Sequence, residues 1–160
     1  SLMSSIDLVI QNITMGSMSR LQSEGLLKAL KSGTGLVGCH GGIGDSFRVN
    51  ITNDNDPICA GIKDFEIQDT EQYYMHIDLN TKVLATTRFT DSVHSWIKDR
   101  VMPVAWKTYY GTGRVFYLSI GHDPKDFNTL EAKQLLFRGI RWASGSKYEL
   151  KESTLNAVYE

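Results

Sequence analysis

The alternation of apolar and polar positions predicts a strand, a helix and a second strand within the first 40 residues. The run "IDLVIQNI", Ile6 to Ile13, is short and β-branched, which is typical of a buried strand. Ser19 and Gln22 have the spacing of a capping box, and Gly33 ends the helix that they begin. Another strand begins at Gly35. A strand, helix and strand in this order predict two parallel strands, and ligands bind beyond the carboxyl ends of such strands. The end of "GLVGCHGG" lies at that position.

The last third of the chain predicts a β-hairpin followed by a helix. In "MPVAWKTYYGTGRVFYLSIGHD" two β-rich runs, 103–107 and 114–120, flank a turn with two glycines. Apolar residues recur from Leu130 at helical spacing, with Asn128 and Glu131 as the expected cap pair and Gly145 at the end. Between these parts, "ITNDNDPI" is turn-forming and "KVLATTRF" predicts a strand, whereas 65–77 has no clean period. The predicted fold is α/β: a mostly parallel, doubly wound sheet with a late hairpin and a C-terminal helix.

The composition and net charge of the chain indicate which classes of binding partner are not expected. A chain of 160 residues with a net charge of -1 is expected to form one domain, here 1–145 with a polar tail at 146–160, and no global field attracts nucleic acid or an anionic membrane. No apolar run approaches the roughly 20 residues of a membrane span. Two cysteines suggest a reducing compartment rather than a disulfide framework, so a cytoplasmic protein is expected. The tail and the hairpin are candidate surfaces for a homo-oligomer.

Four segments carry a resemblance to a known family. In this order, "GLVGCHGG", "DTEQYY", the hairpin block and "RGIRWASG" resemble the ThuA-like (trehalose utilisation) proteins, whose fold is similar to that of class I glutamine amidotransferases. The resemblance implies a role in the utilisation of trehalose, related disaccharides or their oxidised derivatives. It also implies two absences: a strand and helix before Ile6, and some tens of residues between Asn50 and Ile51 that contribute to the site region in the family.

Two histidines at strand ends lead the candidate site. His40 and His122 each follow a predicted strand and each stands beside glycine, which lets a ligand approach closely. Glu71 and Tyr73 alternate on an extended stretch and so share a face. A carboxylate beside two imidazoles is typical of acid/base chemistry, so we predict His40, Glu71 and His122 as the catalytic residues. A divalent metal such as zinc remains open, although no dedicated metal motif is present.

Cys39 offers a second and different chemistry. "GCHG" resembles the nucleophile elbow of the amidotransferases and related PfpI-type proteins, in which a helix N-terminus lowers the thiol pKa. His122 and Asp123 would complete a triad. Against this, most ThuA-like proteins have an aliphatic residue here, and free cysteine is commonly buried. Neighbouring residues on a strand also point to opposite faces, so Cys39 and His40 are poorly placed to share a proton.

Substrate contacts are expected from Tyr73, Trp106, Arg114 and Asp123. Aromatic faces stack on sugar rings and arginine holds hydroxyl or carboxylate groups, although the apolar neighbours of Trp106 favour hairpin packing for that residue. Three functions therefore remain: an enzyme acting on a carbohydrate by acid/base chemistry, a sugar-binding or regulatory module without catalysis, and a Cys-dependent hydrolase or amidotransferase.

Overall fold

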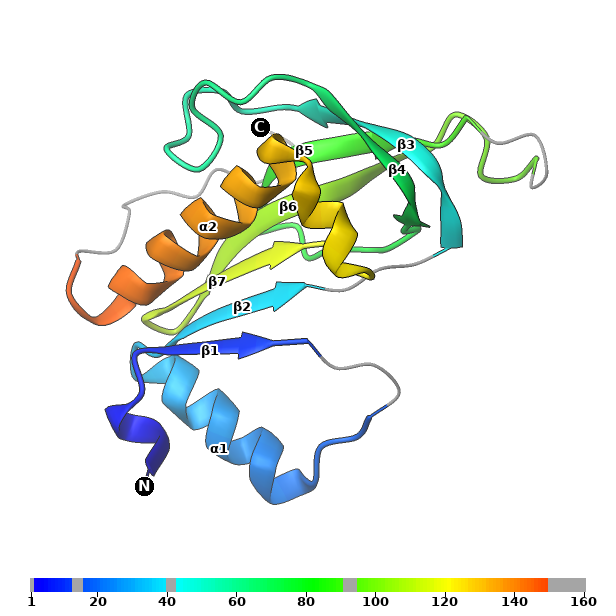
Figure 1. The fold of residues 1–160 in the computed structure, drawn as a ribbon. Helices are drawn as coiled ribbons and strands as arrows, with labels where there is room; N and C mark the ends of the chain where they lie inside the picture. The colour runs from blue at the N-terminus through cyan, green and yellow to red at the C-terminus, as the bar shows by residue number, and fades with distance from the viewer. Residues whose placement is uncertain (1, 13–15, 40–42, 91–94, 150–160) are drawn as a thin grey trace.

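The chain forms a seven-stranded β-sheet with an α-helix against each of its faces (Figure 1). This computed structural model describes residues 2–12, 16–39, 43–90 and 95–149. The strands are β1 (Leu8–Gln11), β2 (Gly35–Cys39), β3 (Ile43–Ile51), β4 (Phe65–Gln72), β5 (Lys82–Arg88), β6 (Val101–Tyr110) and β7 (Gly113–Leu118). The helices are α1 (Arg20–Lys31) and α2 (Leu130–Ser144), with 3-10 turns η1 (Leu2–Ser5), η2 (Pro124–Asn128) and η3 (Gly145–Lys147).

The sheet is mixed, which corrects one sequence prediction. Its order is β1-β2-β7-β6-β5-β3-β4. The β1/β2 and β2/β7 pairs are parallel, whereas β7/β6, β6/β5, β5/β3 and β3/β4 are antiparallel. The α/β class, the hairpin and the C-terminal helix are confirmed, but a mostly parallel doubly wound sheet is not. The physical reason is that the described residues between β3 and β7 contain no α-helix to make a crossover, and antiparallel neighbours need only turns and loops.

The predicted strand, helix and strand at the N-terminal end are confirmed. β1 and β2 pair in parallel, with Leu8 opposite Gly35. The capping box is present: Gln22 donates its backbone N–H to Ser19 Oγ, and the Ser19 N–H donates to Gln22 Oε1. Because both orphan donors are satisfied, α1 begins where the sequence indicates.

Helix α2 covers the face of the sheet formed by β2 and β7 (Figure 1). Gly139 makes this close approach possible, since a Cβ there would overlap the ring of the buried Phe116 on β7. Arg138 ties the helix to the 53–62 turn by donating to the Ala60 carbonyl at 2.6 Å. The N-cap of α2 is Thr129, so the predicted Asn128 cap is wrong by one residue, because Asn128 belongs to η2.

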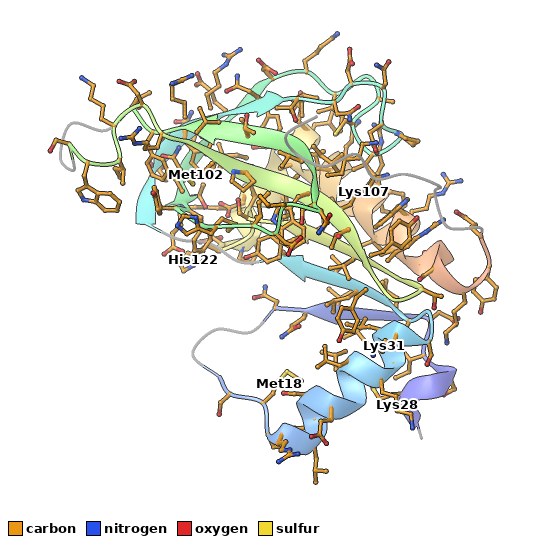
Figure 2. The ribbon with its side chains drawn as sticks, turned by 180° about the vertical axis from the view of Figure 1, so that it is seen from behind. Met18, Lys28, Lys31, Met102, Lys107 and His122 are labelled. Carbon is orange, nitrogen blue, oxygen red and sulfur yellow. The ribbon has the colours of Figure 1, made fainter. Side chains whose placement is uncertain are left out.

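A buried ion pair connects the 53–62 turn to the hairpin. Lys107 is fully buried on β6, and its Nζ lies 2.9 Å from Asp56 Oδ2, which Lys82 Nζ also meets at 3.0 Å. The Lys107 ammonium additionally lies 4.7 Å from the centroid of the Trp142 ring, and Figure 2 labels it within the sheet. Burial acts to raise the pKa of Asp56, but hydrogen bonds from Lys107 and the Ile58 amide hold it below its ordinary value. A charge so deeply buried persists only because it is paired.

Strand β3 was not predicted from the sequence. It runs without interruption through Asn50 and Ile51, the junction at which the family resemblance implies a longer segment. The strand pairs with β4 on one side and with β5 on the other. None of the helices in the described ranges is long and apolar enough to cross a membrane.

Candidate functional site

The end of β4 and the loop after β7 bring an acid and a histidine together. His122 Nδ1 lies 3.1 Å from Glu71 Oε2, although 51 positions separate the two residues in the sequence. The His122 side chain is 50% exposed and that of Glu71 is 25% exposed. Figure 2 shows His122 at the edge of the sheet toward which the arrowhead of β2 points. The pairing therefore gives an imidazole that a carboxylate orients and that solvent can reach.

A β-bulge in β4 decides which way Glu71 faces. Asp45 pairs with Thr70 but Phe47 pairs with Ile67, so β4 holds one extra residue at this point. Asp69 occupies the bulge with a φ of 49°, and its N–H donates to Ser46 Oγ. Before the bulge the buried positions of β4 are Phe65 and Ile67, and after it Thr70 is buried. The extra residue thus shifts the alternation, turning Thr70 into the protein and Glu71 outward.

A buried carboxylate lies behind the histidine and the acid. Asp126, in η2, is 2% exposed, and its Oδ2 accepts from Thr70 Oγ1 at 2.7 Å. The same oxygen accepts from the Gly121 N–H at 3.2 Å and from the Asp123 N–H at 3.4 Å. Gly121 has a φ of 122°, a conformation for which glycine is suited. Each main donor is the immediate neighbour of a site residue: Thr70 precedes Glu71, and Gly121 precedes His122.

An aromatic group extends the site across the sheet. Burial, Tyr117 and Glu71 together raise the pKa of Tyr73 to about 12, so Tyr73 stays a neutral phenol at physiological pH. Tyr117 stacks on Trp106 with ring centroids 5.2 Å apart and planes inclined by 15°. Gly38 leaves room for this tyrosine, since a Cβ there would lie 2.9 Å from Tyr117 Cδ2. Tyr117, which the sequence analysis did not single out, thus stacks on Trp106 and contributes to the raised pKa of Tyr73.

Cys39 lies at the end of β2 but lacks the surroundings of an activated thiol. Its side chain is buried, and burial raises its pKa above the ordinary value. β2 ends at Cys39 and β3 begins at Ile43, so no helix follows the cysteine as the elbow hypothesis requires. Burial also raises the pKa of Cys59, to about 12. His40 lies outside the described residues.

Asp123 and Arg114, which the sequence predicts as substrate contacts, form hydrogen bonds or ion pairs with other residues of the protein. Asp123 caps η2 by accepting from the Lys125 N–H at 2.9 Å. Arg114 is buried at the start of β7, at the far end of that strand from His122, where it donates to the Trp142 carbonyl and pairs with Glu149 at 2.7 Å. The structure therefore brings together Glu71, Tyr73 and His122, and does not bring Arg114 to them. No three metal-ligating side chains cluster within the described part of the chain.

Comparison with known proteins identifies the family. The model of the ThuA family, described as trehalose utilisation, matches residues 44–143. This chain belongs to the ThuA family. The match contains β4, the hairpin and all but the last residue of α2, and so includes Glu71, Tyr73 and His122. The resemblance inferred from the hairpin block is thereby confirmed.

Solved structures share the fold of this ThuA chain. A ThuA-like protein from Bacteroides uniformis has a TM-score of 0.68 at 14% identity, covering 91% of this chain and 71% of that one. A ThuA-like protein from Parabacteroides merdae has a TM-score of 0.64 at 14% identity, covering 91% and 73%. A cytoplasmic protein from Salmonella typhimurium has a TM-score of 0.54 at 9% identity, covering 89% and 73%. No curated protein matches the chain.

Sequence reasoning missed Thr70, Tyr117 and Asp126 in this ThuA site. Thr70 lies within the quoted stretch "DTEQYY", but its burial depends on the bulge at Asp69. Asp126 follows the "GHDP" segment and could have been read only as a polar turn residue. Its contact with Thr70 joins positions 56 residues apart, for which the sequence carries no local signal.

Proposed function

We propose that this ThuA protein binds a small carbohydrate in the cytoplasm and that His122 transfers a proton to or from it. The substrate class is trehalose, a related disaccharide or an oxidised derivative. The observation that carries the proposal is the 3.1 Å contact between His122 Nδ1 and Glu71 Oε2. A carboxylate that accepts the Nδ1–H fixes the tautomer of a histidine, and the proton is then exchanged at Nε2.

The chemistry is proton transfer at a hydroxyl group or at a carbon next to a carbonyl group. When His122 accepts that proton at Nε2, the imidazolium that forms is stabilised by the charge of Glu71. In an exchange or an isomerisation His122 returns the proton to the substrate, and in an elimination it gives the proton to the leaving group. His122 therefore ends each reaction in its starting protonation state.

Classical glycoside hydrolysis is a poorer fit to the cluster. That reaction generally needs two carboxyl groups that flank the bond to be broken. Near His122, Asp123 caps η2 and Asp126 is buried with three backbone or side-chain donors, which leaves Glu71 as the accessible carboxylate among the described residues. A single oriented imidazole suits proton transfer better than it suits cleavage of an acetal.

The aromatic residues supply the binding surface. Tyr73 remains protonated over the physiological range and so can donate a hydrogen bond to a sugar hydroxyl. Trp106 and Tyr117 offer ring edges and faces beside it, and aromatic faces pack well on the apolar C–H edges of sugars. Proton transfer then takes place at the polar end of this surface, where His122 and Glu71 meet.

The test measures binding and proton exchange separately. Trehalose, sucrose, maltose and a keto derivative of a disaccharide are titrated by calorimetry, and exchange of their carbon-bound protons is followed by NMR in deuterated water. We expect His122→Asn to lower the rate of exchange by about 10²- to 10⁴-fold, the usual contribution of a general acid or base, while binding survives. His76→Asn is the matched control, because His76 is exposed and packs edge-on against Tyr74.

The alternatives give different results. Binding without exchange in the unaltered protein would establish the sugar-binding module instead of the enzyme. Equal exchange by the unaltered protein and His122→Asn would remove His122 from the reaction. Loss of exchange on alkylation of the cysteines, with His122→Asn still active, would favour the Cys-dependent hydrolase or amidotransferase.

A further inference from the structure

We propose that Asp126 is a positioning residue that holds Glu71 and His122 in register through Thr70 and Gly121. This inference rests on the proposed function of the site. Asp126 touches neither site residue directly. Its Oδ2 instead accepts from the residue before each of them, at 2.7 Å from Thr70 Oγ1 and 3.2 Å from the Gly121 N–H.

Thr70 and Glu71 are neighbours on β4 and point to opposite faces of the sheet. Thr70 is 3% exposed and faces the interior, where its hydroxyl donates to Asp126. Glu71 comes next on β4 and therefore points to the opposite face. Fixing the hydroxyl of Thr70 thus fixes the backbone that carries Glu71. The bulge at Asp69 interrupts the β3/β4 ladder just before Thr70, and pairing resumes at Thr70 and Glu71. The tie to Asp126 therefore adds a side-chain restraint directly beside the bulge.

Asp126 also restrains the loop that carries His122. β7 ends at Leu118, so His122 stands beyond the sheet, on a backbone that turns through Gly121 at a φ of 122°. The Gly121 N–H is directed at Asp126, and the Asp123 N–H meets the same oxygen at 3.4 Å. Amides on both sides of His122 are therefore bound to one carboxylate oxygen. Hydrogen bonds to a charged acceptor are stronger than those between neutral groups.

The other carboxylate oxygen of Asp126 points to a role beyond local stability. Oδ1 is buried and has no hydrogen-bond partner among the described residues. A buried carboxylate with an unsatisfied oxygen is costly, and native proteins rarely keep one without a further reason. Restraint of two elements that approach from distant parts of the sequence is such a reason.

The experiment uses Thr70 to cut the link without touching the buried charge. Thr70→Val keeps the shape of the side chain and removes the donor, whereas Thr70→Ser restores the hydroxyl. Nitrogen-15 NMR at alkaline pH, where histidine rings are neutral, reports which ring nitrogen of His122 carries the proton. We expect His122 to be protonated at Nδ1 in the unaltered protein, a mixture of both tautomers in Thr70→Val, and a return toward Nδ1 in Thr70→Ser. His76 in the same spectra should not change.

The NMR measurement of the His122 tautomer needs no substrate. It therefore tests the positioning role of Asp126 separately from the proposed function. If the tautomer shifts as expected but no variant or parent exchanges sugar protons, the positioning role stands and the proposed function fails. If exchange occurs, Thr70→Val should lower kcat by about 10- to 100-fold with KM nearly unchanged, because small displacements of a catalytic group cost that much. Thr90→Val, at an exposed threonine, is the control and should leave both constants unaltered.

A folded Thr70→Val variant with the parent's His122 tautomer would overturn the proposal, whatever its activity. Asp126→Asn provides a second variant, since asparagine keeps the shape but places an amide where the carboxylate stood. It should produce the same mixture of tautomers at His122. Thermal unfolding of each variant establishes that the protein is folded, and Asp54→Asn, on an exposed turn residue, is the matched control.

Discussion

His122 Nδ1 lies 3.1 Å from Glu71 Oε2, joining a loop that follows β7 to the end of β4. The two strands are not neighbours in the sheet, since β6, β5 and β3 lie between them. The contact therefore depends on the curl of the sheet and on the loop, rather than on strand pairing. Five expected outcomes follow from this arrangement and from the packing around it.

Glu71→Gln removes the charge that orients His122 while keeping the size of the side chain. We expect the rate of proton exchange on the sugar to fall by about 10²-fold, because an amide no longer stabilises the imidazolium that forms during transfer. Glu66→Gln is the control, since Glu66 is an exposed acid on the same strand. Equal loss in both variants would point to a general effect of charge on β4.

The two cysteines should react slowly with thiol reagents in the folded protein. Burial raises the pKa of Cys39 above its ordinary value and that of Cys59 to about 12, so the thiolate that attacks such reagents is scarce at neutral pH. Ellman's reagent at pH 7 should label both thiols only as the protein unfolds in urea. Rapid labelling of Cys39 in the native protein would revive the nucleophile hypothesis.

Asp56→Ala should destabilise the protein by about 3–5 kcal/mol, because it removes the carboxylate that pairs with the fully buried Lys107. Urea unfolding measures this loss. The double variant Asp56→Leu with Lys107→Met should recover much of it, since apolar groups of similar volume replace a buried pair at little cost. If Asp56→Ala were as stable as the parent protein, another group would have to neutralise Lys107.

The same pair gives a pH dependence with a defined sign. The pKa of Asp56 is held below its ordinary value of 3.8, so the unfolded chain binds this proton more readily than the folded one. The stabilisation is fully present above that value and is lost as the pH falls through the lower pKa of the folded state. Urea unfolding between pH 2 and 6 should show a weaker loss at low pH in the double variant.

Asp69→Val should strain the bulge that turns Glu71 outward. Asp69 has a φ of 49°, which costs a β-branched residue about 1–2 kcal/mol and costs glycine nothing. We expect Asp69→Val to lower the free energy of unfolding by that amount and to weaken proton exchange, while Asp69→Gly stays close to the parent in stability. Thermal unfolding and the exchange assay check both effects. Equal stability of the two variants would contradict a bulge that is restrained at this φ.

Local patterns predicted the elements whose signals lie within a few neighbouring residues. The capping box of Ser19 and Gln22, the hairpin of β6 and β7, and the amphipathic helix α2 were all legible, because caps, turns and periodic burial act over short spans. Strand β3 was not predicted, because its sequence contains polar residues and follows glycines. The family was likewise legible, because its blocks are contiguous.

By itself, the sequence determined the start of α1, the hairpin and the family, and it singled out Glu71, Tyr73 and His122 as candidate site residues. Only the tertiary structure decided that the sheet is mixed, that Arg114 is buried at the far end of β7, and that Glu71 meets His122. The physical reason is distance along the chain. One extra residue at Asp69 reverses which side chains face the site, and a carboxylate 56 positions from Thr70 holds the result in place.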